Sequence, residues 1–453
     1  MGVNRMESEV IISNKLGQAS NKNITAEGRI FMRGVKFGLV LFATCLFTLA
    51  LGGLAYAFHS GGVAECGGCH SMHAPKAGGS FLLIGSDASS TCLSCHQQSG
   101  LLTPSSYHVG TAEADMPTGV APRQRTPGGD FGWLKKSYTF TVRSATTTEA
   151  GETHGHNIVA TDFGFLADAT NTTAPGGTLS SSQLGCQSCH EPHGGVRRLS
   201  DGTYVRQSAS AGGTTYPIIA SGSYNNSVTP AAGQAVGGYR LLRGLNDSSQ
   251  GVTFTGVAIA IAPSTYNQTE ATNQVRVAYG ADGINTWGNW CAACHPRMHS
   301  SGNYVHPIDQ SLGSDIATAY NAYVKTGDLT GSAATSFTSL VPFAENTGVI
   351  STLQSHSKND NTYLNGPATS DKVMCLSCHR AHASGFPEML RWNMEGEFMV
   401  YNSQYPGTDT TPTVPQFARG RLGAETQAAY YDRPVTQFGS YQRVLCNKCH
   451  AKD

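Results

Sequence analysis

The sequence holds few of the residues that build an ordinary hydrophobic core. Aliphatic, aromatic and cysteine residues make up 39% of the 453 positions, while glycine alone accounts for 53 of them. The length would allow two or three domains, but this supply of apolar side chains is thin for conventional cores. We therefore expect something other than side chains to fill much of the interior.

An excess of positive charge is also absent. The whole chain has 30 Lys and Arg against 30 Asp and Glu. The first 57 residues hold six of the basic and three of the acidic residues, so the rest of the chain carries a small net negative charge. Nucleic-acid binding, which depends on basic surface patches, is not expected.

All but one of the cysteines belong to a single repeated motif. Twelve of the 13 lie in six copies of C-x-x-C-H, the attachment signature of a c-type haem, in which both thiols bond to the porphyrin and the histidine ligates the iron. Zinc or iron–sulfur ligation would not require a histidine directly after every second cysteine. We predict six covalently bound haems, and no disulfides, because the thioethers consume these thiols. The motifs are Cys66/Cys69/His70, Cys92/Cys95/His96, Cys186/Cys189/His190, Cys291/Cys294/His295, Cys375/Cys378/His379 and Cys446/Cys449/His450.

The remaining cysteine, Cys45, lies in an apolar run over residues 37–54. Basic residues precede this run and Ala55-Tyr56-Ala57 follows it, which is typical of a secretory signal cut before Phe58. The run is also long enough to span a membrane if it stays uncleaved. We interpret residues 1–57 as a leader and signal peptide, with Met32 as an alternative start. Since c-type haem is attached outside the cytoplasm, the protein is expected to pass through the periplasm to the outer cell surface or beyond.

The mature part, residues 58–453, offers about 66 residues for each haem. So few residues predict a single unit of mostly irregular chain, with short helices and a few short strands, wrapped around a linear haem stack. A few ordinary elements are still expected. Alternating apolar residues predict a strand over residues 137–144 and a second one over 256–262. A helix is predicted over residues 315–325, with Ser314 as its N-cap.

The histidines outside the motifs show a regular pattern. The first, third and fifth motifs continue as C-x-x-C-H-x-x-H, and a further histidine stands upstream of each of these three motifs. Together with the six motif histidines they supply twelve ligands for twelve axial positions, in three haem-pair repeats over about residues 58–110, 150–300 and 350–453. The predicted distal ligands are His73, His193, His382, His59, His156 and His356. Left over are His108, which is the first reserve, His154, His299 and His306.

His73 needs an iron other than that of His70, because both histidines lie on the same side of the ring. If each H-x-x-H histidine reaches back to the preceding odd-numbered motif, His193 serves the first haem and His382 the third. The fifth haem then lacks a ligand, and His73 lacks an iron. We predict that His73 ligates the fifth haem of a neighbouring copy. Such a head-to-tail contact between different surfaces grows a filament unless it closes into a ring.

Several segments closely resemble the OmcS family of outer-surface hexahaem c-type cytochromes, which form extracellular electron-conducting filaments. The resemblance covers nearly the whole mature chain, and it departs in the leader and around residues 76–90, 204–260 and 402–425. It implies haems with two histidine ligands, a continuous haem stack and one ligand donated across the subunit boundary, which maps to His73. The segments include FHSGGVAECGGCHSMH, SSYHVGTAEADMPTGVAP, TPGGDFGWLKK, APSTYNQTEAT, CLSCHRAHASGF and YQRVLCNKCHAKD.

We interpret the protein as an electron-transfer cytochrome and not an enzyme. It is expected to polymerise with itself and to pass electrons from redox partner cytochromes to extracellular acceptors such as metal oxides or electrodes. One alternative is a multihaem reductase, which needs a five-coordinate haem, often with Lys as the proximal ligand, whereas every motif here ends in histidine. The other is a monomeric periplasmic electron shuttle, which has the same chemistry without polymerisation.

Overall fold

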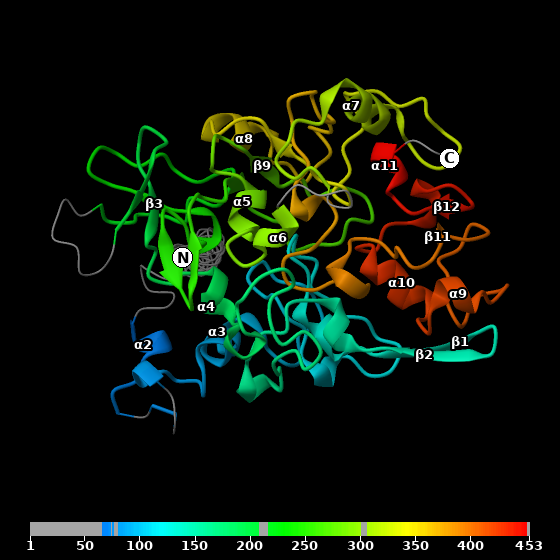
Figure 1. Cartoon of the computed structure of the whole chain (residues 1–453), viewed down its shortest axis with the longest axis horizontal. Helices are drawn as coiled ribbons and strands as arrows, with labels where there is room; N and C mark the ends of the chain where they lie inside the picture. The colour runs from blue at the N-terminus through cyan, green and yellow to red at the C-terminus, as the bar shows by residue number, and fades with distance from the viewer. Residues whose placement is uncertain (1–65, 74, 77–79, 208–215, 300–305, 451–453) are drawn as a thin grey trace, which may run out of the picture. The chain divides into compact units, whose positions relative to one another are not determined.

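Short helices and strands joined by long irregular segments make up the structure, which is a computed structural model (Figure 1). It describes residues 66–73, 75–76, 80–207, 216–299 and 306–450. Within these ranges the longest helix, α7, has ten residues and the longest strands have five. The predicted fold class, mostly irregular chain with short elements, is confirmed.

The helices are mostly single turns. They are α2 (Cys66–Cys69), α3 (Ala88–His96), α4 (Cys186–Cys189), α5 (Trp287–Cys291), α6 (Pro296–His299), α7 (Gly313–Ala322), α8 (Ile350–His356), α9 (Pro415–Ala418), α10 (Gly423–Ala429) and α11 (Asn447–His450).

The strands form five small sheets. Three are two-stranded antiparallel pairs, β1–β2, β6–β7 and β11–β12, and two are three-stranded, in the orders β4-β3-β5 and β10-β9-β8. The pairing of β10 with β9 is parallel. The strands are β1 (Tyr138–Val142), β2 (Ala145–Glu149), β3 (Val196–Arg198), β4 (Tyr204–Arg206), β5 (Val236–Gly237), β6 (Asp247–Ser249), β7 (Val252–Phe254), β8 (Ala260–Ile261), β9 (Ala278–Gly280), β10 (Ala344–Glu345), β11 (Phe398–Val400) and β12 (Gln442–Arg443).

The three ordinary elements expected from sequence are present with different bounds. β1 lies inside residues 137–144, and its alternation places Tyr138 in the interior. Only two residues of 256–262 form a strand, β8, although the whole stretch from Val257 to Ala262 is buried. Helix α7 begins at Gly313, so Ser314 is not its N-cap as predicted, because its hydroxyl donates to the adjacent Asp315 carboxylate instead.

Two large clusters of buried apolar side chains lie beside the haem-attachment motifs. One gathers residues of β8 and β9 with Trp287 and Trp290, and the other gathers Tyr320 and Tyr323 with side chains from the last third of the chain. Motif cysteines pack against the margins of both clusters. They are Cys189, Cys291 and Cys294 in the first and Cys378, Cys446 and Cys449 in the second.

The chain divides into two units, Met1–Tyr56 and Ala57–Asp453. The first lies outside the described residues, as do the predicted signal peptide and His59. Within the described part of the chain, no helix has the length and apolar character needed to cross a membrane.

Candidate haem-binding sites

Each C-x-x-C-H motif is folded as about one helical turn. The first cysteine of each motif lies on α2, α3 or α4, begins η8 (Cys375–Ser377), ends α5 or directly precedes α11. In five motifs the histidine N–H donates to the carbonyl of the first cysteine at 2.8–3.1 Å. Residues three and four apart on a helix share one face, so both thiols and the imidazole are directed to the same side.

The motif thiols differ in exposure. Cys66 and Cys95 are exposed, while the other motif cysteines are partly buried. Cys95 lies near the exposed end of α3, where every buried residue precedes Ser94. The Ser94 hydroxyl lies 3.9 Å from the Cys95 Sγ. The first two predicted haem sites therefore each have one attachment thiol at the surface of the chain.

The motifs follow one another in a linear order that matches the sequence. Thiols of the second and third motifs, Cys92 and Cys186, lie close enough to shift each other's pKa, and so do Cys291 and Cys375 of the fourth and fifth. The remaining neighbours lie close enough to interact electrostatically: the first motif with the second, the third with the fourth, and the fifth with the sixth. The six motifs therefore form a continuous array along the folded chain.

Four motif histidines face a second imidazole at a nearly constant distance. The ring centroids are 6.1–6.4 Å apart in every pair. The pairs are His70 with His193, His190 with His382, His295 with His156, and His450 with His306.

This distance fits two ligands on opposite sides of one metal ion. An imidazole nitrogen lies about 2 Å from a metal that it ligates, and the ring centroid lies about 1 Å further away. Two imidazoles in line through one iron therefore have centroids about 6 Å apart, as these four pairs do. Elsewhere in the described residues, no group of three or more His, Cys, Asp or Glu side chains is placed to hold a metal ion.

The second motif also has a nearby histidine. Burial lowers the pKa of His108, and the neighbouring His96 lowers it further. The two histidines therefore lie close together. The Tyr107 ring lies near both, with its centroid 6.5 Å from that of His96 and 4.3 Å from that of His108. The Nδ1 atom of His108 is hydrogen-bonded to the Ser105 hydroxyl, whereas its buried Nε2 has no hydrogen-bond partner. That nitrogen is a free donor for a metal.

His156 and His382 are held in the neutral form, and His156 is also held in a fixed orientation. Burial lowers the pKa of His156 to about 4 and that of His382 to about 3. The Nδ1 atom of His156 donates to the Ala381 carbonyl at 2.7 Å, which directs Nε2 toward His295. A neutral imidazole with one nitrogen held by a carbonyl leaves the other free to ligate a metal.

His356, an expected distal ligand, faces no motif histidine in the described residues. Its Nδ1 is 2.6 Å from the Glu345 carboxylate and its ring stacks on Tyr363 at 4.1 Å. The imidazole opposite the last motif histidine is instead that of His306, which sequence reasoning left unassigned. No motif or spacing marks His306, so only the tertiary structure could identify it.

Two histidines that the sequence singled out have no imidazole opposite them in the described residues. His379 donates from Nδ1 to the Glu388 carbonyl at 2.7 Å, and its ring faces no other ring there. His73 is exposed and has neither a hydrogen bond nor a ring contact within the described part of the chain. Among the residues described, one motif histidine thus lacks a ligand opposite it, and one exposed histidine is without a partner.

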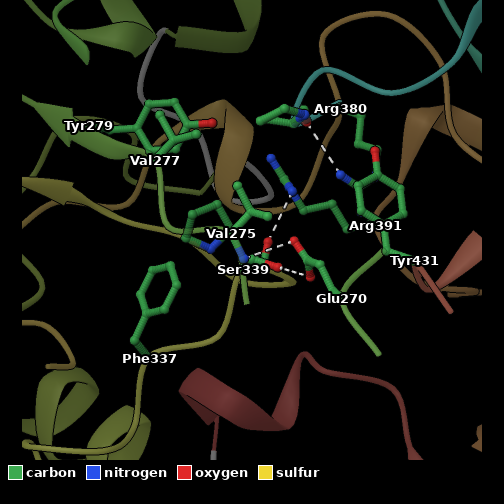
Figure 2. Close-up of a pocket in the computed structure, with 11 residues that line it drawn as sticks. Glu270, Val275, Val277, Tyr279, Phe337, Ser339, Arg380, Arg391 and Tyr431 are labelled. Atoms are coloured by element: carbon green, nitrogen blue, oxygen red, sulfur yellow. Dashed lines mark hydrogen bonds between the residues drawn. The ribbon is translucent and has the colours of Figure 1, made fainter. Parts of the chain in front are cut away.

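Buried arginines lie beside the fifth motif (Figure 2). Arg380 is 2% exposed, stacks on the Tyr431 ring at 3.7 Å, and has no partner for Nε or Nη2. Arg391 donates from Nε to the carbonyls of Leu376 and His379. Burial lowers the pKa of Arg380 to about 10, which still leaves it charged at neutral pH. An unpaired buried guanidinium calls for an anionic partner, such as the propionate of a haem.

Comparison with known proteins gives one consistent result. The chain is 49% identical over 448 residues to the C-type cytochrome OmcS of Geobacter sulfurreducens, covering 93% of this chain and 100% of that protein. Two solved structures of OmcS from the same organism, titled as nanowires and as a filament, match with a TM-score of 0.79 at 48% and 49% identity. Each match covers 87% of this chain and 100% of the solved chain. No protein-family model matches.

Proposed function

The chain belongs to the OmcS family of c-type cytochromes, electron-transfer proteins with covalently bound haem, and from this premise we propose that it is a subunit of an extracellular filament that conducts electrons through six haems. The observation that carries the proposal is the series of imidazole pairs at 6.1–6.4 Å along a linear array of C-x-x-C-H motifs.

The donor set supports haem as the cofactor. The twelve described cysteines are free to form thioethers, and the six motif histidines would be the proximal ligands. Bound haem supplies a one-electron couple of ferric and ferrous iron. The chain provides the attachment points, the imidazole ligands and a water-poor surrounding. Because the motifs lie near one another in order, haems held there would allow electrons to pass along the subunit without any group moving.

We assign five distal ligands within the chain. His193, His382 and His156, all expected from sequence, would serve the first, third and fourth haems. His108 and His306 would serve the second and sixth, in place of the expected His59 and His356. With two imidazoles on each iron, the haems have no open position, which favours electron transfer over the reductase alternative.

The sixth distal ligand would come from a neighbouring copy. His379 lacks an opposing imidazole in the described residues, and the exposed His73 lacks an iron. These two sites lie at different motifs, the fifth and the first, so the contact between copies is head-to-tail and continues as a filament. A monomeric shuttle would leave the fifth haem incomplete. Homopolymeric assembly is supported by the filament structures of the related OmcS.

The buried arginines would neutralise the haem propionates. Arg380 and Arg391 lie next to the fifth motif, and two guanidinium nitrogens of Arg380 have no hydrogen-bond partner. A carboxylate there would complete a charge-assisted pair. A positive charge near the haem disfavours ferric iron, and a propionate that pairs with it offsets this effect. These residues would therefore also help to set the reduction potential of that haem.

We further propose that the leader, residues 1–57, is removed on export and that the mature protein acts outside the cell. Its electron donors would be other cytochromes, and its acceptors metal oxides or electrodes. Intact mass and electron microscopy of the secreted protein test the proposal. Six haems add about 3.7 kDa, and the protein is expected to form filaments. A mass with fewer haems, or globular particles alone, would contradict it.

A further inference from the structure

Three short segments of the structure repeat one unusual backbone conformation. In η1 (Ser80–Leu82), η7 (Tyr239–Leu241) and η9 (Pro387–Met389), the second and third residues both have positive φ angles, between 51° and 59°. All of these residues carry a β carbon, for which the left-handed region is sterically disfavoured. We name each segment, with the leucine that follows it, a carbonyl turn.

Each carbonyl turn is hydrogen-bonded to the proximal histidine of an odd-numbered motif. The carbonyl oxygen of the second turn residue accepts a hydrogen bond from the histidine Nδ1 at 2.7–2.8 Å in all three copies. The pairs are Phe81 with His70, Arg240 with His190, and Glu388 with His379.

The bonds that flank this contact are the same in the three copies. The residue after each motif histidine donates its backbone N–H to the carbonyl oxygen of the third turn residue, at 2.7–2.8 Å. The residue after the turn leucine donates its backbone N–H to the carbonyl oxygen of the second motif cysteine, at 2.8–3.1 Å. The leucine itself forms an antiparallel bridge with the histidine, in the pairs His70 with Leu83, His190 with Leu242, and His379 with Leu390.

The even-numbered motifs are built differently in the residues that the structure describes. The Nδ1 atom of His96 is bonded to the Tyr107 carbonyl at 2.6 Å, and that of His295 to the Pro175 carbonyl at 2.9 Å. Neither carbonyl residue has a positive φ angle. In the described residues the carbonyl turn thus accompanies all three C-x-x-C-H-x-x-H motifs and neither the second nor the fourth motif.

Side-chain packing does not explain the disfavoured conformation at two of the three turns, although at the third the Arg240 guanidinium packs on the Tyr224 and Tyr266 rings. Phe81 is 84% exposed and Glu388 is also exposed, so neither side chain gains burial from its position. The turns follow their histidines by 11, 50 and 9 residues, so a shared chain spacing does not explain them either. What the three copies share is the placement of one carbonyl oxygen on Nδ1.

We propose that the carbonyl turns are positioning elements that orient the proximal imidazoles of the first, third and fifth haems and lower the reduction potentials of these haems. A hydrogen bond from Nδ1–H to a carbonyl fixes the ring and makes the imidazole a stronger donor to the iron. A stronger donor favours the ferric state, which lowers the potential. The inference rests on the proposed haem attachment, since it concerns the ligands of that haem.

Phe81 offers a matched pair of substitutions in the full secreted protein. In Phe81→Pro the ring fixes φ near −65°, so the turn cannot form, whereas Phe81→Gly accepts a positive φ freely. A spectroelectrochemical titration should show one haem of Phe81→Pro shifted to higher potential and the others unchanged. Phe81→Gly should titrate like the parent. Glu388→Pro and Glu388→Gly should repeat the result for the fifth haem.

Intact mass separates the two levels of the proposal. A Phe81→Pro protein with six haems and unchanged potentials would overturn the role of the turn and leave the proposed function standing. A parent protein without haem would overturn the proposed function itself. Loss of the first haem alone in Phe81→Pro would support the positioning role. If that variant is not secreted, Phe81→Val, which disfavours the same conformation, should give a smaller shift in the same direction, and no shift would overturn the inference.

Discussion

Glu149 is the centre of a buried charge network that anchors the segment leading to His156. Its side chain is 3% exposed and accepts hydrogen bonds from Arg421, which is 1% exposed, and from His154 at 2.7 Å. Arg419 lies 3.3 Å from its other oxygen. Burial alone would raise the pKa of Glu149, but the bonds from His154 and Arg421 lower it to about 2.

The lowered pKa of Glu149 gives the expected loss of folding stability in Glu149→Gln. An unfolded Glu has a pKa of about 4.3, so the lowered pKa contributes about 3 kcal/mol of stability at neutral pH. Because the folded pKa is the lower one, this contribution is complete above the unfolded pKa and is lost as the pH falls toward 2. Removing the carboxylate also leaves the Arg421 charge buried and unpaired, so we expect a loss of about 3–5 kcal/mol.

Urea unfolding of the haem-loaded protein, followed by circular dichroism, measures the effect. At pH 7 the free energy of unfolding of Glu149→Gln should fall by the stated amount, and the variant should lose less stability than the parent between pH 5 and pH 2. Glu395→Gln is the control, since Glu395 pairs with Arg419 but is 49% exposed, and it should cost less than about 1 kcal/mol. Equal stabilities for Glu149→Gln and the parent would refute the reasoning.

Three further predictions concern the haem sites. His306→Ala should convert one haem to a high-spin form that binds cyanide, while His356→Ala should leave all haems low-spin. Optical and electron paramagnetic resonance spectra measure the spin states. The opposite pattern would show that His356, the ligand expected from sequence, ligates the haem. His108→Ala should likewise open one haem, and a fully low-spin spectrum would rule out His108 as a ligand. Arg380→Leu should lower the potential of one haem, because a buried cation that disfavours ferric iron is removed; an unchanged titration would separate Arg380 from the propionates.

The irregular fold could be predicted because it follows from local features. Six C-x-x-C-H motifs in a chain with few apolar residues leave the polypeptide little core of its own, and the structure has the expected short elements. The bounds of α7 were less predictable. Whether Ser314 or Leu312 precedes the first helical residue depends on contacts of one side chain, which periodicity does not reveal.

The ligand pairs were only partly predictable, because they join segments far apart in the sequence. His193 and His382 follow their motifs at a fixed spacing, so a repeat identifies them as candidates. His356 belongs to the same repeat, but its ring contacts Glu345 and Tyr363 and faces no motif histidine in the described residues. In the sequence, the carbonyl turns share only a Leu-Leu or Met-Leu pair, which follows the motif histidine at variable distances. This pattern is too short to be recognised without the structure.

The central claim is that His73 completes the fifth haem of a neighbouring subunit, and His73→Ala tests it most directly. The variant should keep six haems, because both ligands of its own first haem are unaffected. Filament yield should fall sharply in micrographs, and one haem in the secreted monomer should be high-spin. Added imidazole should restore the low-spin spectrum without restoring filaments. Normal filaments with every iron low-spin would contradict the account.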